Sequence, residues 1–262
     1  MTIIDTHVHL NFPQFHPDLE ATIDRAWQHD LVAMVNIGTD LATSEESVNL
    51  ATRHSKVYAT VGLHPHDADL WASQFDGLKQ LARQPKVVAI GEIGLDYYRN
   101  ISARDKQVEA FRAQLGLALK LGKPVVIHCR DAYTELISIL EVDYMPHLGG
   151  RLPGVIHSFA AGPAHAMTFL KMGFYLGLNN MVSYPTNASL IESVKIIPLD
   201  RIVLETDCPF LPPWSLRGKR CEPIHVIEVA RKIAEIKDVS VRSVEDSSTR
   251  NASTIFQLAL NA

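Results

Sequence analysis

The chain has 262 residues, of which 47% are hydrophobic, and α/β barrels of about 250 residues form single domains, so one large core is expected. A formal net charge of −4 argues against a generally basic nucleic-acid-binding protein, so a polyanionic substrate would need a local patch of positive charge. Three cysteines without paired spacing fit a reducing compartment better than a disulfide framework: Cys129, Cys208 and Cys221.

Short β-branched runs alternate with longer amphipathic segments along the chain, which is typical of repeated β-α units and a parallel sheet. Eight strands are predicted, at Ile3–His7, Ala33–Ile37, Val57–Leu63, Val87–Gly91, Pro124–His128, Gly154–His157, Gly173–Gly177 and Arg201–Thr206. Several runs are apolar without alternation, as expected for strands covered on both faces. The sequence therefore predicts an α/β fold, a single (β/α)8 barrel of the TIM type that spans residues 1–262.

The clearest helical pattern runs from Arg104 to Leu121. Apolar residues recur there at helical spacing and are expected to face the barrel: Val108, Phe111, Leu115 and Leu119. Gly122 and Pro124 end this helix before the next strand, and Pro198 ends another. We find no low-complexity linker, so a division into two domains has little support.

We expect a cytoplasmic protein without a membrane segment and without an obligate protein partner. The sequence opens without a basic segment ahead of a long apolar run. No later stretch approaches the ~18 uninterrupted apolar residues of a membrane span.

Polar residues gather at or just past the carboxyl ends of the predicted strands, where a β/α barrel carries its active site. They are His7, His64, Glu92, His128, His157 and Asp207. Buried histidines and helix-capping acids are common one at a time, but structural residues that arose independently would not all collect at one end of a barrel. The sequence therefore predicts one metal site at that end.

The first strand ends in His7 and His9, which lie two residues apart and so project from the same face of an extended segment. Glu92 adds a carboxylate between small glycines, and such a carboxylate can bridge two cations. His128 and His157 each end an apolar strand, where an unpaired polar side chain would be costly and a metal would satisfy it.

Asp207 completes this set at the end of the last strand. Glu205 lies two residues earlier on the same strand face, so we expect it to orient a ligand histidine rather than bind metal. Asp5 has the same relation to His7 and is expected to be buried support.

These motifs together resemble the TatD-type metal-dependent nucleases, a family within the amidohydrolase-like metal barrels. The resemblance covers nearly the whole chain, through the segments Asp5–Leu10, Gly62–His66, Gly91–Asp96, His128–Ala132, Glu205–Asp207 and Arg217–Pro223. The chain departs from the family pattern at Cys221, where asparagine is usual, and this puts one loop contact in doubt.

The resemblance implies a centre with two divalent cations, in which His7, His9 and Asp207 hold one and Glu92 bridges to the other, held by His128 and His157. It further implies hydrolysis of phosphodiester bonds in DNA, often by 3′-to-5′ trimming. Mg²⁺ or Mn²⁺ is the expected working metal, and histidine-rich sites also take Zn²⁺.

Asp207 is the expected residue for positioning the attacking water and accepting its proton. His64 is assigned to the scissile phosphate or the leaving group, and His66 to substrate binding in the same motif. Donors for substrate phosphates are expected from Arg130, Arg217, Lys219 and Arg220. Aromatic residues of the same loops are candidates for stacking on unpaired bases, although ordinary loop packing is the commoner role: Tyr97, Tyr98, Phe159, Tyr184 and Trp214.

Other activities use the same barrel and ligands. A small-molecule hydrolase, such as a lactonase or a phosphotriesterase-like enzyme, is the main alternative. Glu92 stands where the carboxylated-lysine members of that wider group have their bridging lysine, and this disfavours them. Removal of D-amino acids from charged tRNA is a further alternative, and a metal-stabilised binding protein without turnover is another.

Overall fold

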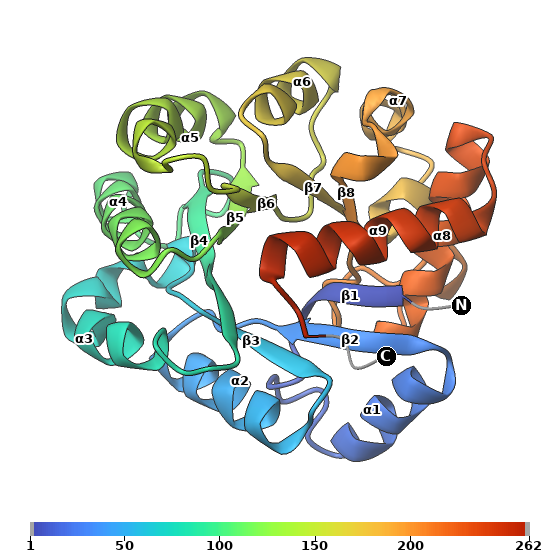
Figure 1. The fold of residues 1–262 in the computed structure, drawn as a ribbon, viewed down its shortest axis with the longest axis horizontal. Coiled ribbons are helices and arrows are strands. Elements are labelled where there is room, and N and C mark those ends of the chain that lie inside the picture. The colour runs from blue at the N-terminus through green and yellow to red at the C-terminus, as the bar shows by residue number, and fades with distance from the viewer. Residues whose placement is uncertain (1–2, 260–262) are drawn as a thin grey trace. The chain divides into compact units, whose positions relative to one another are not determined.

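The computed structural model describes residues 3–259, so residues 1–2 and 260–262 of the predicted domain lie outside the described residues (Figure 1). The described chain contains one eight-stranded sheet in the order β1 to β8. The strands are β1 (Ile3–Val8), β2 (Leu31–Asn36), β3 (Val57–Val61), β4 (Val87–Asp96), β5 (Val125–Arg130), β6 (Gly154–Ile156), β7 (Tyr175–Leu178) and β8 (Ile202–Leu204). Neighbouring strands pair in parallel, for example β4 with β5 and β7 with β8. All eight predicted strands are present.

Helices follow the strands in alternation, as Figure 1 shows by label and colour. They are α1 (Leu19–Gln28), α2 (Leu41–Arg53), α3 (Trp71–Leu81), α4 (Arg104–Leu121), α5 (Tyr133–Ile139), α6 (Pro163–Lys171), α7 (Ala188–Ile196), α8 (Val226–Lys237) and α9 (Val241–Phe256). Within residues 3–259, no helix has the length and apolar character that a membrane crossing requires.

The chain divides into two compact units, which are described separately. Unit 1 comprises the chain up to Asn36, Ser158–Lys171 and the chain from Tyr175 onward, and unit 2 comprises Ile37–His157 and Met172–Phe174. The sequence predicts one domain, whereas the contacts within the chain group its residues into these two units. The single domain itself stays a prediction.

In unit 1 the first and last strands bring distant parts of the chain together. β1 is buried along its whole length, and a bridge joins Val8 to Cys208, just after β8. The backbone N–H of His9 donates to the Cys208 carbonyl at 2.9 Å, and that of Asp207 to the His7 carbonyl at 3.0 Å. These bonds place the residues that follow β1 and β8 side by side.

In unit 2 the strand ends differ from the prediction. β4 continues to Asp96, because Gly94 pairs with His128 and Asp96 pairs with Arg130 on β5. A side chain at Gly94 would overlap the His128 carbonyl, so this glycine permits the close approach of the two strands. Glu92, predicted just past its strand, therefore lies inside β4. His128, predicted as the last residue of its strand, lies inside β5.

The helix over Arg104–Leu121 is confirmed with the predicted bounds, and Gly122 ends it in the left-handed conformation with φ of 67°. The prediction of its buried face is confirmed only in part, since Phe111 and Leu115 are buried but Val108 and Leu119 are half-buried. Gln107 and Gln114 of the same helix are buried instead, and both form hydrogen bonds with the backbone at or beyond the end of a strand.

Gln114 of α4 accepts from the N–H of Leu63 at 2.7 Å and donates to its carbonyl at 3.0 Å. Gln107 does the same for Asp96, at 2.8 and 3.1 Å. Both glutamines thus replace ladder hydrogen bonds that β3 and β4 lack at their carboxyl ends. They fix the backbone beside His64 and at Asp96, where the candidate site begins.

Candidate metal centre

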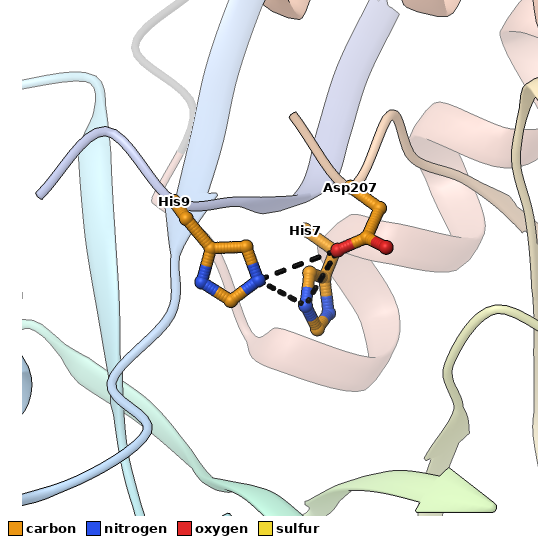
Figure 2. Close-up of side chains that lie close together, drawn as sticks. All are labelled: His7, His9 and Asp207. Atoms are coloured by element: carbon orange, nitrogen blue, oxygen red, sulfur yellow. Dashed lines mark hydrogen bonds and ion pairs between the residues drawn. The ribbon is translucent and has the colours of Figure 1, made fainter. Parts of the chain in front are cut away.

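His7, His9 and Asp207 form the first cluster, in unit 1 (Figure 2). The Nε2 atoms of His7 and His9 lie 3.2 Å apart. Asp207 Oδ1 lies 3.3 Å from His9 Nε2 and 3.7 Å from His7 Nε2. Figure 2 shows both imidazoles and the carboxylate pointing toward one another. His7 comes from β1, His9 from the residues just after it, and Asp207 from the segment after β8.

The spacing of these three atoms fits a bound cation. Ligand atoms about 2.1 Å from a cation lie about 3.0–3.4 Å apart in octahedral or tetrahedral geometry. The separations of 3.2, 3.3 and 3.7 Å in the first cluster are close to this range. The two imidazole nitrogens suit Zn²⁺, and the carboxylate oxygen suits Mg²⁺ or Mn²⁺.

A buried carboxylate supports the first cluster from below. Asp5 accepts hydrogen bonds from the N–H groups of His7 and Thr206, at 3.2 and 3.0 Å, and from the Thr206 hydroxyl at 2.6 Å. Burial raises the pKa of Asp5 well above its usual value. Asp5 therefore ties β1 to the segment that carries Asp207, and its expected burial is confirmed.

Glu92, His64, His128 and His157 form the second cluster, in unit 2. Glu92 Oε1 lies at its centre, 3.0 Å from His128 Nδ1, 3.6 Å from His64 Nε2 and 3.7 Å from His157 Nε2. The register between β4 and β5 shifts beside Glu92, whose N–H donates instead to the Gly38 carbonyl at 2.9 Å. This irregularity directs the carboxylate toward the histidines.

Asp96 is a residue of this site that sequence reasoning missed. Its Oδ2 lies 3.1 Å from His128 Nε2 and 2.9 Å from His66 Nε2, and its side chain is buried. Its Oδ1 accepts from the N–H groups of Tyr98 and Arg99, at 3.0 and 2.8 Å. A carboxylate on one imidazole nitrogen fixes the ring so that the other nitrogen can bind metal.

The protonation of the second cluster follows from these contacts. Burial lowers the pKa of His64 well below its usual value, although Glu92 acts in the opposite direction. Burial also acts to lower the pKa of His128, but hydrogen bonds to Asp96 and Glu92 outweigh it and raise this pKa. Burial raises the pKa of Asp96, yet its hydrogen bonds, with His128 first, bring it below the usual range.

Glu205 and Cys221 both lie in unit 1, before and after Asp207 in the sequence. Glu205 is buried, and its Oε1 accepts from the N–H of Ser158 at 2.6 Å. Cys221 is also buried; its N–H donates to the Pro209 carbonyl at 3.0 Å, and its Sγ lies 3.8 Å from Asn180 Nδ2. All three cysteines are free thiols.

The cationic side chains expected to bind phosphate have different surroundings. Arg130 is exposed and lies over the ring of Tyr98, 3.8 Å from its centroid. Arg217 is exposed and lies over Trp214 at 4.8 Å, and Lys219 is exposed as well. These three side chains stay open to solvent.

Arg220 is held within the protein instead. Its guanidinium donates to both carboxylate oxygens of Asp18, at 2.7 and 2.8 Å, and to Glu222 at 2.9 Å. Arg25 completes the group, 3.2 Å from Asp18 and 2.9 Å from Glu222. The geometry assigns Arg220 a place in this ion-pair network, which anchors the loop that carries Arg217 and Lys219.

The aromatic candidates also separate. Phe159 is buried, so its ring has no face for a base. Tyr97 donates its hydroxyl to Glu135 at 2.6 Å, and Tyr184 donates its own to the Pro212 carbonyl at 2.8 Å. Tyr98 and Trp214 are exposed.

The chain is similar to known proteins over nearly its whole length. The family model described as TatD related DNase matches residues 4–257. The uncharacterized metal-dependent hydrolase YabD of Bacillus subtilis (strain 168) is 38% identical, over 98% of this chain and 99% of the relative. The 3′-5′ ssDNA/RNA exonuclease TatD of Enterobacter lignolyticus (strain SCF1) is 35% identical, over 98% of this chain and 100% of the relative.

A solved structure shows the same similarity. YJJV, a TatD homolog from Escherichia coli K12, superposes with a TM-score of 0.91 at 28% identity, over 98% of each chain. This likeness and the strand order β1 to β8 confirm the predicted fold class, a (β/α)8 barrel.

Proposed function

Because this chain belongs to the family of TatD-related DNases, we propose that it removes nucleotides from the 3′ end of single-stranded DNA by metal-dependent hydrolysis. Family membership makes the chain a metal-dependent hydrolase. The nuclease activity is supported by the 35% identical relative from Enterobacter lignolyticus, which is named a 3′-5′ ssDNA/RNA exonuclease. The observation that carries the proposal in the chain itself is the first cluster, where three donor atoms stand at ligand spacing.

The proposal assigns one divalent cation to each cluster. His7, His9 and Asp207 would hold the first, and Glu92, His128 and His157 the second. Mg²⁺ and Mn²⁺ suit the carboxylates, and the histidines also suit Zn²⁺. Bound cations would polarise the phosphate and stabilise charge on the attacking and leaving oxygens.

The residues of the chain divide the remaining work. Asp207 is 15% exposed at its side chain, so water can reach the carboxylate, and we assign it the proton of the attacking water. His64 and His66 would contact the scissile phosphate or the leaving group. The ring of His64 is set for this because its Nδ1 accepts from the His66 N–H at 3.1 Å.

The phosphates on either side of the cleaved bond would be bound by the exposed cations Arg130, Arg217 and Lys219. Local positive charge of this kind lets an acidic chain bind a polyanion. Arg220 contributes by anchoring the loop through Asp18 and Glu222.

The test is digestion of single-stranded oligonucleotides by metal-stripped protein. Strands labelled at the 5′ end should shorten one nucleotide at a time after Mg²⁺ or Mn²⁺ is returned, and 3′-labelled strands should release labelled mononucleotide at once. Protein without returned metal should leave both intact. Cleavage confined to small lactones or phosphotriesters would replace the proposal with the small-molecule alternative, and cleavage of charged D-aminoacyl-tRNA alone would replace it with deacylation.

A further inference from the structure

We propose that Phe210 forms a base-binding subsite beside the first cluster, where its ring stacks on the unpaired base next to the cleaved bond. The inference rests on the proposed function, since it names the part of a single-stranded nucleic acid that the site would recognise beyond its phosphate. Phe210 follows Asp207 by three residues and is 46% exposed, although large aromatic side chains are usually covered.

The Phe210 ring stands directly against a metal-ligand candidate. Its centroid lies 6.2 Å from that of His9, with the ring planes at 68°. The Phe12 ring contacts both: it stacks on His9 with centroids 4.5 Å apart and meets Phe210 edge to face with centroids 6.0 Å apart. A nucleotide with its phosphate at the first cluster would have its base within reach of the exposed face of Phe210.

Hydrogen bonds hold the backbone around Phe210. Its N–H donates to the Asp207 carbonyl at 2.9 Å, and the N–H of Cys221 donates to the Pro209 carbonyl at 3.0 Å. The two residues before Phe210 are also held, because the N–H of His9 donates to the Cys208 carbonyl at 2.9 Å. A ring held in place before the ligand arrives loses little entropy on binding, so stacking on it is more favourable.

The segment after Phe210 carries the charge that a nucleic acid requires. Trp214, 42% exposed, presents a second ring with the Arg217 guanidinium 4.8 Å from its centroid, and Lys219 is exposed nearby in sequence. Aromatic rings interleaved with cations are the pattern of single-strand binding, in which rings stack on bases and cations bind phosphates. The occupant we infer is therefore a single-stranded nucleic acid, because base faces are not available in a duplex.

The test compares the binding of two single-stranded oligonucleotides. One is complete, and the other lacks only the base of its 3′-terminal nucleotide and keeps every phosphate. Both strands carry phosphorothioate linkages against cleavage, and affinity is measured by fluorescence anisotropy for wild type, Phe210→Ala, Phe210→Tyr and Met167→Ala. Met167 of α6 is the matched control, because this apolar side chain is 44% exposed and belongs to neither the site nor the loop. Metal content is measured for each variant, so that damage to the first cluster is recognised.

The wild type should prefer the strand with the base by about 5- to 150-fold, the range of base–aromatic stacking. Phe210→Ala should lose this preference, whereas Phe210→Tyr and Met167→Ala should keep it. A preference retained in Phe210→Ala, or absent from the wild type, would overturn the inference. Cleavage of unmodified strands by the wild type reports separately on the proposed function, which can then stand when the subsite does not.

Discussion

In the first cluster the donor atoms of His7, His9 and Asp207 lie about as far apart as the ligands of one cation do. In the second cluster each ring nitrogen of His128 already has a carboxylate partner, Glu92 at Nδ1 and Asp96 at Nε2. The first cluster is held mainly through the backbone, because Asp5 binds N–H groups of His7 and Thr206. The second is held through side chains, because Asp96 binds the imidazoles of His66 and His128. The first cluster is therefore preorganised by the fold, and the second by a hydrogen-bond network.

This difference predicts how each cluster responds to substitution. Removing a backbone tie should change the stability of the fold, while removing an imidazole tie should change metal affinity with little effect on the fold. The two clusters can thus be separated by isosteric changes that alter a single charge or hydrogen bond.

The largest effect is expected at the centre of the second cluster. Glu92→Gln nearly keeps the shape of the side chain but removes the charge that faces His64, His128 and His157. Binding of the cation at the second cluster should weaken and turnover should fall by about 100-fold or more, because the carboxylate at the centre of this cluster loses its charge. Metal content after dialysis and the rate of oligonucleotide cleavage check this together, and wild-type values for both would remove Glu92 from the metal ligands.

A smaller effect on metal binding, about 10- to 100-fold in affinity, is expected from Asp96→Asn. The amide oxygen can still accept from the N–H groups of Tyr98 and Arg99. The NH2 group that replaces Oδ2 can no longer accept from the imidazoles of His66 and His128. Isothermal titration with Mn²⁺ should show the weakening in one of the two binding events only. An unchanged titration would reduce Asp96 to a residue that supports the turn at Tyr98 and Arg99.

Asp5→Asn is the matched change in the first cluster. Its amide oxygen can still accept from the N–H groups of His7 and Thr206, but its NH2 group cannot accept from the Thr206 hydroxyl. A buried hydrogen bond lost in this way costs about 1–3 kcal/mol. The free energy of unfolding in urea should fall by that amount. Loss of metal affinity without loss of stability would contradict the account of Asp5 as a backbone tie.

The ligand candidates can be selected from the sequence because their signals are local. His7 and His9 share a strand face, and His128 ends an apolar run, so position and chemistry can be read together. Asp96 was missed since the predicted strand stopped at Gly91, and only pairing with β5 carries β4 on to Asp96. Because Asp96 was expected to lie in a loop beyond the strand, the sequence did not indicate its contact with His66 and His128.

The basic loop shows the same limit. Arg217 and Arg220 are alike in the sequence, but the partner of Arg220 is Asp18, which lies 202 residues away. Long-range pairing of this kind has no local signal. Phe210 was not singled out either, because exposure of an aromatic ring depends on how its segment is tied to β1.

The smallest effects are expected in this loop. Replacing Arg217 and Lys219 together with Ala should weaken oligonucleotide binding and reduce the slope of log affinity against log salt by about 1.4, since two phosphate contacts are lost. Arg220→Ala should leave that slope unchanged and lower stability by about 1 kcal/mol through the ion pairs with Asp18 and Glu222. Equal slopes for all three proteins would refute the phosphate contacts.

The number of Mn²⁺ ions bound per chain tests the central claim most directly, because two separate clusters should hold two separate cations. Metal-stripped wild-type protein, equilibrated with Mn²⁺ by dialysis, should bind two ions per chain. His9→Ala, which removes one donor of the first cluster, should reduce the count to one, held by the second cluster. A wild-type chain that binds a single ion, or a variant that loses both, would contradict the account of two clusters with one cation each.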